Sequence, residues 1–154
     1  MPKASVKRLI ECKKKYLMDL VLDIEKYPEF VPLCFDAKIH ENKNEGDLTR
    51  IIADLTIGKG LFKDTYKSDV VFNKKKDSIF VKNIKGPLDH LSNNWKFTDK
   101  KNGITEVTFD IDFEIKNKFL NSLMVVSFQF GLEKIADAFQ KRAEELFRNS
   151  KNQI

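Results

Sequence analysis

The chain has 154 residues, of which 42% are hydrophobic and 33% are charged, and its formal net charge is +5. This size and balance are typical of a soluble globular protein, and no apolar run approaches the roughly 20 residues that a membrane-spanning helix needs. The excess of positive charge weakly favours partners with negative surfaces, such as anionic lipid headgroups or RNA.

One domain is expected over residues 1–148, followed by a frayed tail over residues 149–154. The two cysteines, Cys12 and Cys34, lack metal-binding spacing, and no secretion signal or transit peptide is recognisable at the N-terminus. We therefore expect reduced thiols and a cytoplasmic protein of bacterial type, with peripheral contact at the inner membrane as a further option.

A strand and two short helices are expected at the start of the chain. Residues Val6–Cys12 predict the strand, and Pro28 ends the first helix. The apolar side of that helix consists of Tyr16, Leu17, Leu20, Val21 and Ile24. Pro28 at a first helical position permits one or two further turns. These turns present Phe30, Val31 and Leu33, with Pro32 between them. The three apolar side chains either fill part of the core or form the entrance of a tunnel.

The middle of the chain predicts consecutive antiparallel strands joined by short polar turns. The strand segments are Cys34–His40, Thr49–Ile57, Phe62–Phe72, Ser78–Ile84, Leu91–Thr98 and Thr105–Ile115. Gly58-Lys59-Gly60 is expected to break or bulge the chain. The last segment alternates without error, with Val107, Phe109 and Ile111 on one face and acidic residues on the other, which indicates a strand that is wet on one side only.

A long helix is expected after the last strand. Its apolar positions at helical spacing are Phe119, Leu123, Val126, Phe130, Ile135, Phe139 and Leu146, and the apolar stripe is widest in the first half. Together the elements predict an α+β fold, in which this helix lies across the concave face of a curved antiparallel sheet of about seven strands. The helix either fills the space above the sheet or leaves a pocket, and this choice decides the function.

The sequence offers little for catalysis. His40 and His90 have no cysteine or carboxylate at ligand spacing, so we expect no metal site. No nucleophile elbow, phosphate-binding glycine loop or dinucleotide fingerprint occurs. Asp110, Asp112 and Glu114 alternate to the outer face of their strand, where a charged surface is the simpler interpretation than acid/base chemistry. We expect a protein that is not an enzyme and carries no catalytic cofactor.

One strand combines a polar residue with an apolar face. Asn93, Trp95 and Phe97 share that face with Leu91, and an asparagine in such a row needs a hydrogen-bond partner. Either Asn93 bonds to the backbone in an ordinary core, or Asn93 and Trp95 offer N–H groups to the carbonyl of an apolar ligand.

Three groups of residues carry a resemblance to a known family. They are Tyr27-Pro28-Glu29-Phe30-Val31-Pro32-Leu33-Cys34; Phe62-Lys63-Asp64-Thr65-Tyr66 with Ser68-Asp69-Val70; and Gly86-Pro87-Leu88-Asp89-His90-Leu91 with Asn94-Trp95-Lys96-Phe97. In this order they resemble the family of ubiquinone-binding coenzyme-Q chaperones and ribosome-association toxins, within the START-like helix-grip superfamily of polyketide cyclases and lipid-transport proteins. The match runs from Ala4 to about Phe147, and Leu88 stands where an aromatic residue is common.

The resemblance implies a non-catalytic binder of a polyprenyl quinone, ubiquinone or a related lipid, which passes it to respiratory complexes at a membrane. The implied tunnel would involve Phe30, Val31, Pro32, Leu33, Trp95, Phe97, Leu123, Val126 and Phe130. Asn93 and Phe109 complete the candidate ligand-binding residues. The last three tunnel residues are assigned from helical phase alone.

Two other functions stay open. A ribosome-binding protein that contacts the large subunit and blocks subunit joining would use the basic charge for phosphate contacts, although lysine heavily outnumbers arginine and no DNA-binding pattern occurs. A cyclase or dehydratase of the same superfamily would need acid/base residues on the inward rows, which are apolar here.

Overall fold

A computed structural model describes the chain except for residues 1–2, 33, 60–61, 86–87, 116–131 and 149–154. In chain order the elements are β1 (Lys3–Ile10), α1 (Lys14–Leu22), the 3-10 helix η1 (Ile24–Glu29), β2 (Cys34–Glu45), β3 (Leu48–Lys59), β4 (Phe62–Asn73), β5 (Ser78–Lys85), β6 (Leu88–Asp99) and β7 (Thr105–Ile115). A C-terminal helix covers the described residues 132–148. No helix within the described ranges is long and apolar enough to cross a membrane.

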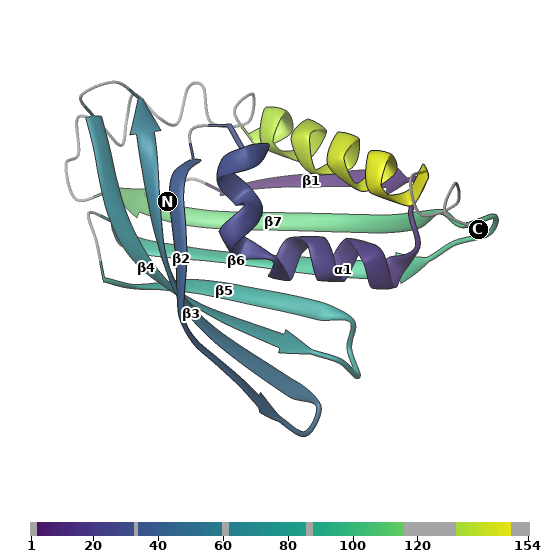
Figure 1. Cartoon of the computed structure of the whole chain (residues 1–154), viewed down its shortest axis with the longest axis horizontal. Helices are drawn as coiled ribbons and strands as arrows, with labels where there is room; N and C mark the ends of the chain where they lie inside the picture. The colour runs from purple at the N-terminus through teal and green to yellow at the C-terminus, as the bar shows by residue number, and fades with distance from the viewer. Residues whose placement is uncertain (1–2, 33, 60–61, 86–87, 116–131, 149–154) are drawn as a thin grey trace.

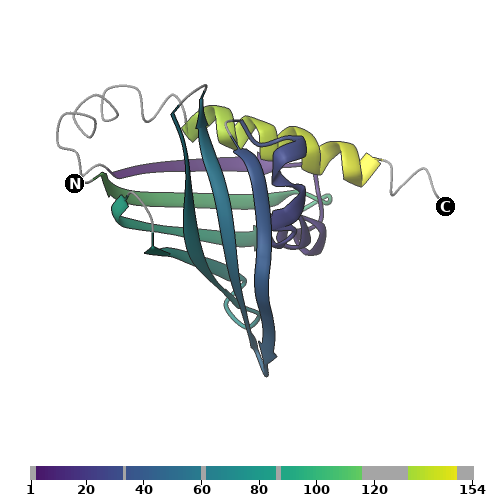
Figure 2. The same cartoon turned by 60° about the vertical axis from the view of Figure 1, so that its left-hand side comes forward.

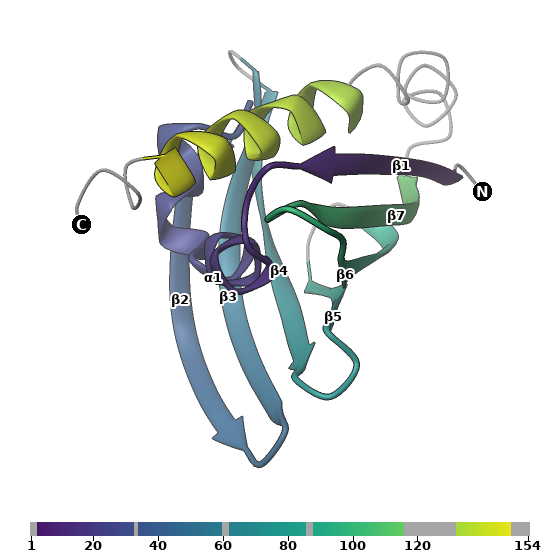
Figure 3. The same cartoon turned by 90° about the vertical axis from the view of Figure 1, so that its right-hand side faces the viewer.

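All seven strands form one antiparallel sheet with the order β1-β7-β6-β5-β4-β3-β2, so the first strand pairs with the last. Bulges interrupt the pairing in β2, between β4 and β5, and at the start of β6, and such irregularities bend and twist strands. Figure 3 shows the result: the sheet curls, α1 lies inside the curve, and the C-terminal helix bridges the opening. The predicted α+β class and its strand number are therefore confirmed.

The C-terminal helix lies along β1 and β7 and beside α1 in two views (Figures 1 and 2). Its sheet-facing side chains are buried at Leu132, Phe139, Ala143 and Phe147. Leu146, which helical spacing placed on the same stripe, is instead 43% exposed. At this end the helix meets α1 through the Tyr16–Phe147 ring contact at 6.3 Å, so the buried side turns towards α1.

The short helices bury one side, as the sequence indicates. Leu17, Leu20, Val21 and Ile24 are each at most 5% exposed, whereas Tyr16 is 39% exposed at the edge. The helix boundary differs from the prediction, because Pro28 lies inside η1 and does not begin a new helix. A 3-10 turn tolerates this proline, since few backbone N–H groups in so short a helix are needed for hydrogen bonds.

Several strand boundaries also differ from the prediction: β1 spans Lys3–Ile10 and not Val6–Cys12, and β6 begins at Leu88 and not at Leu91. Strand β2 continues to Glu45, and only Gly46 and Asp47 form the turn, with Gly46 at φ +63° in the left-handed region that glycine adopts easily. Gly58 does not break its strand, because it pairs with Lys63 and β3 runs on to Lys59. In both cases the ladder of backbone hydrogen bonds decides the boundary, and the side chains there carry no apolar alternation.

Candidate functional site

An aromatic cluster joins the sheet, η1 and the C-terminal helix. The rings of Trp95 on β6 and Phe109 on β7 are 4.3 Å apart, and Phe139 of the C-terminal helix meets Trp95 edge-on at 5.1 Å. Phe139 also meets Tyr27 at 5.4 Å and Phe30 at 5.1 Å, both edge-to-face. These geometries are the favoured ones for aromatic pairs, so Phe139 is the residue through which the helix is packed on both elements.

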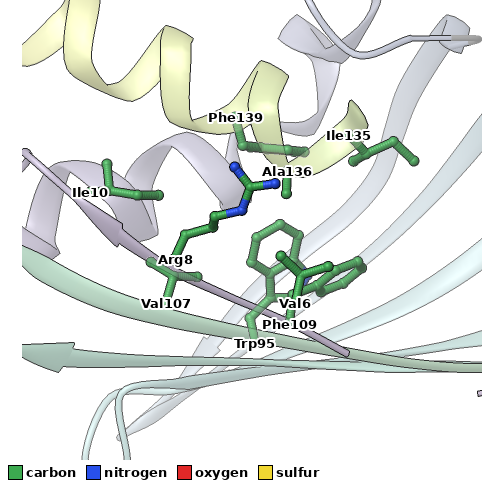
Figure 4. Close-up of a pocket in the computed structure, with 9 residues that line it drawn as sticks. All are labelled: Val6, Arg8, Ile10, Trp95, Val107, Phe109, Ile135, Ala136 and Phe139. Carbon is green, nitrogen blue, oxygen red and sulfur yellow. The ribbon is translucent and has the colours of Figure 1, made fainter. Parts of the chain in front are cut away.

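A cavity lies beside this cluster, between β1, β6, β7 and the C-terminal helix (Figure 4). Its lining residues are Val6, Arg8, Ile10, Trp95, Val107, Phe109, Ile135, Ala136 and Phe139. The space is about 20 Å³ for the centres of water-sized spheres, which is room for about one water molecule. Beside Trp95, the described part of the helix therefore leaves little free space above the sheet.

Arg8 is the charged member of this lining. It lies between Val6 and Ile10 on the inward side of β1, and its guanidinium points towards the helix residues Ala136 and Phe139 in Figure 4. Its Nη1 donates to Asp137 Oδ1 at 2.7 Å and to Gln140 Oε1 at 3.4 Å. The guanidinium thus closes the seam between the sheet edge and the helix.

Asn93 has an unpaired acceptor on the concave face. It lies between Val81 on β5 and Ile111 on β7, one inward position along β6 from Trp95. Its side-chain oxygen Oδ1 is buried and accepts no hydrogen bond from the residues that the structure describes. A buried polar atom without a partner costs free energy, so a backbone partner in an ordinary core does not account for this oxygen.

A second polar contact holds the other side of the helix. Arg142 donates to Glu29 Oε1 at 2.7 Å and its guanidinium carbon lies 5.2 Å from the centre of the Phe30 ring. The hydrogen bond from Arg142 holds the pKa of the Glu29 carboxyl below its usual value. The helix is therefore fastened by one arginine on each side, Arg8 from β1 and Arg142 towards η1.

Two of the four predicted sheet residues line the cavity, and Phe97 and Asn93 do not. Trp95 and Phe109 line it, and Phe97 is buried beside Trp95, with their rings stacked at 6.3 Å, without lining it. Residues of the lining that were not among the predicted site residues are Val6, Arg8, Ile10, Val107, Ile135, Ala136 and Phe139. Their signal in the sequence is the inward alternation of β1 and β7 and the helical spacing.

The residues of the predicted entrance turn differ in their exposure to solvent. Phe30 and Val31 are partly buried against the core, and Pro32 is exposed. The other predicted tunnel residues lie outside the described residues: Leu33, Leu123, Val126 and Phe130.

The cysteine thiols and tyrosine hydroxyls near the core have raised pKa values. Burial raises the pKa of the Cys12 thiol to about 11, and it also raises the pKa of Cys34, Tyr27 and Tyr66. These groups therefore stay protonated at neutral pH, and such thiols are poor nucleophiles.

The histidines pair with single carboxylates on the sheet. His40 Nε2 is 2.7 Å from Asp54 Oδ2, and His90 Nε2 is 3.8 Å from Asp112 Oδ2. Within the described part of the chain, no group of three or more histidine, cysteine or acidic residues could hold a metal ion. Neither histidine lines the cavity.

Residues 11–140 match the family model described as polyketide cyclase/dehydrase and lipid transport. The chain belongs to this family. The match includes β6, β7 and the helix residues of the cavity, but begins after β1. The family expected from the residues is thereby confirmed, and its description covers both enzymes and lipid carriers.

Two relatives are similar to this chain over most of its length. A ribosome association toxin, RatA, of Rickettsia prowazekii is 33% identical over 92% of this chain and 95% of its own length. The mitochondrial coenzyme Q-binding protein COQ10 of Dictyostelium discoideum is 30% identical over 85% of this chain and 63% of its own length. Neither name states an enzymatic activity.

A START superfamily protein from Mycobacterium smegmatis has a TM-score of 0.76 at 18% identity, and the match covers 95% of this chain and 99% of that protein. This likeness confirms the START-like fold.

Proposed function

We propose that this protein binds a polyprenyl quinone such as ubiquinone, or a similar lipid, without catalysis, between the C-terminal helix and the sheet. The observation that carries the proposal is the apolar cavity beneath the helix, lined by Trp95 and Phe109 and closed by one cation. The name of the COQ10 relative supports a quinone as the ligand. In this role the protein supports respiratory electron transport from the cytoplasm, with peripheral contact at the membrane or its respiratory complexes.

Asn93 and Trp95 supply the polar contacts that a quinone head needs. An asparagine amide carries an acceptor oxygen and a donor nitrogen, so either end of Asn93 can serve a ligand. A quinone presents carbonyl acceptors and its reduced form presents hydroxyl donors. The unpaired oxygen of Asn93 would gain a partner from the reduced form, and rotation of the amide would offer N–H to the oxidised form.

Binding requires the helix to move. A drug-sized ligand usually occupies a pocket of about 300 Å³ or more, far above the space of about 20 Å³ beside Trp95. On the β1 side, Arg8 holds the helix through Asp137, Gln140 and the Glu133 carbonyl, and Glu144 accepts from the Glu11 backbone N–H. Exposed ion pairs contribute about 0 to 1 kcal/mol, so the cost of moving the helix comes mainly from the buried packing of Phe139 on Trp95.

Trp95 provides a direct test, because it is the single tryptophan of the chain and lines the cavity. Titration with a short-chain ubiquinone should quench its fluorescence with saturation, and organic extraction of protein purified from quinone-rich cells should release quinone. A non-saturating, collisional quenching curve together with a lipid-free extract would refute the proposal.

A second candidate follows from the RatA relative: association with the large ribosomal subunit, which would block subunit joining. The sheet surface supports it modestly, since Phe80 is 45% exposed and shares its strand face with the exposed Lys82. Co-sedimentation with large subunits by protein whose extract contains no lipid would favour this candidate. A cyclase or dehydratase is less well supported, because no histidine or carboxylate lines the described cavity.

A further inference from the structure

Arg8 is the only charged residue that lines the cavity within the described part of the chain. Two inward neighbours on its own strand, Val6 and Ile10, are apolar and buried. An arginine side chain between two buried apolar positions is not needed for packing, because an aliphatic residue would fill the same row. Its guanidinium therefore calls for an explanation beyond the fold.

The guanidinium of Arg8 keeps unused donor capacity. It has five N–H donors, and its hydrogen bonds to described residues use Nη1, for Asp137 and Gln140, and Nη2, for the Glu133 carbonyl at 3.4 Å. None of these bonds uses Nε–H. A ligand oxygen that entered beside Trp95 could accept from this group without displacing Asp137.

The charges between β1 and the C-terminal helix determine which kind of ligand oxygen can bind there. Asp137 offsets the charge of Arg8 at 2.7 Å, and Glu144 also faces β1, where its carboxylate accepts from the Glu11 backbone N–H at 3.1 Å. Arg8, which lines the cavity, and Asp137 form a charged pair beside it. A carboxylate or phosphate head that approached Arg8 would also meet the carboxylate of Asp137, whereas a neutral oxygen would meet only a donor.

We propose that Arg8 donates a hydrogen bond to a neutral oxygen of the ligand head, and that the Arg8–Asp137 pair discriminates against lipids with acidic heads. This inference rests on the proposed function and specifies its ligand class: an isoprenoid or alkyl lipid with a carbonyl or ether oxygen, of the quinone type. Arg8 is then a specificity-determining residue that also holds the helix.

The test compares two probes by Trp95 fluorescence: decylubiquinone, which is neutral, and decanoate, which has a tail one carbon shorter and a carboxylate head. Arg8→Gln should weaken decylubiquinone binding about tenfold, as expected for the loss of one charge-assisted hydrogen bond. Asp137→Asn should strengthen decanoate binding about tenfold. Lys141→Gln, at an exposed position of the same helix, removes one positive charge elsewhere and should change neither affinity by more than about twofold.

Each other outcome counts against a specific claim. Equal loss of quinone affinity in Arg8→Gln and Asp137→Asn would mean that Arg8 only fastens the helix, which overturns the inference. Decanoate binding as tight as decylubiquinone binding in the unmodified protein would do the same. If the unmodified protein binds neither probe, the proposed function itself fails. Arg8→Lys keeps the charge and one donor group, so it tests the same point should Arg8→Gln unfold.

Discussion

Replacement of Phe139 by alanine probes the packing of the C-terminal helix most directly. Phe139 is 5% exposed and its ring meets three others, at 5.1 Å, 5.1 Å and 5.4 Å. Removal of a buried phenylalanine side chain costs about 3 to 5 kcal/mol, part of which comes from aromatic pairs worth about 0.5 to 1.5 kcal/mol each. For a domain of this size, that loss lowers Tm by roughly 6 to 20 °C.

Urea denaturation followed by Trp95 fluorescence measures this loss. Leu146→Ala is the matched control, because Leu146 lies on the same helix and is 43% exposed, and it should cost less than about 1 kcal/mol. The space released by Phe139→Ala joins the cavity beside Trp95, so the variant should also bind a small apolar probe such as toluene. A loss below about 1 kcal/mol for Phe139→Ala would refute the view that this ring fixes the helix to the sheet.

Three further predictions concern charged and titratable groups. Because burial raises the pKa of Cys12 from 9.0 to about 11, its contribution to stability is complete below pH 9 and is lost as pH rises to 11. Urea denaturation should show a decrease of about 2 to 3 kcal/mol over that range, relative to Cys12→Ala; equal pH dependence in both proteins would contradict the burial argument. Arg50→Met should lower the free energy of unfolding in chemical denaturation, because it leaves the carboxylate of Asp69, which is 4% exposed, without its forked partner at 3.0 Å and 2.9 Å; the double variant with Asp69→Asn should recover most of the loss. Since Arg142 lowers the pKa of the Glu29 carboxyl, their contact stabilises the fold above pH 4.5 and is lost as pH falls through the lowered value, so calorimetry should find Glu29→Gln less stable than the unmodified protein at pH 7, by a difference that shrinks as the pH falls below 4.5.

The strands with strict alternation were predictable from the sequence. Strand β7 has the predicted bounds, Thr105–Ile115, because its apolar face packs on the core and its acidic face does not. Helix α1 was recognisable because its apolar residues also lie on one side, which packs on the core. The end of β2 was not, since its last residues are polar on both faces and are ordered only by pairing with β3.

The candidate site was predictable only in part. Trp95 and Phe109 were identified because they are large apolar residues on inward positions. Arg8 was missed because β1 is an edge strand in which Leu9, 59% exposed, points outwards and obscures the alternation. The volume of the cavity depends on how side chains from three strands and a helix interlock, and no periodic pattern encodes that quantity.

The pairing of β1 with β7 also constrains how the chain is made. Lys3 aligns with Asp112, so more than a hundred positions must be synthesised before the first strand can find its neighbour. Until then β1 has no backbone partners, and closing so long a loop slows folding. An amino-terminal tag or truncation that disturbs Lys3–Ile10 would consequently impair the pairing of β1 with β7. It would also disturb the side of the cavity that β1 forms.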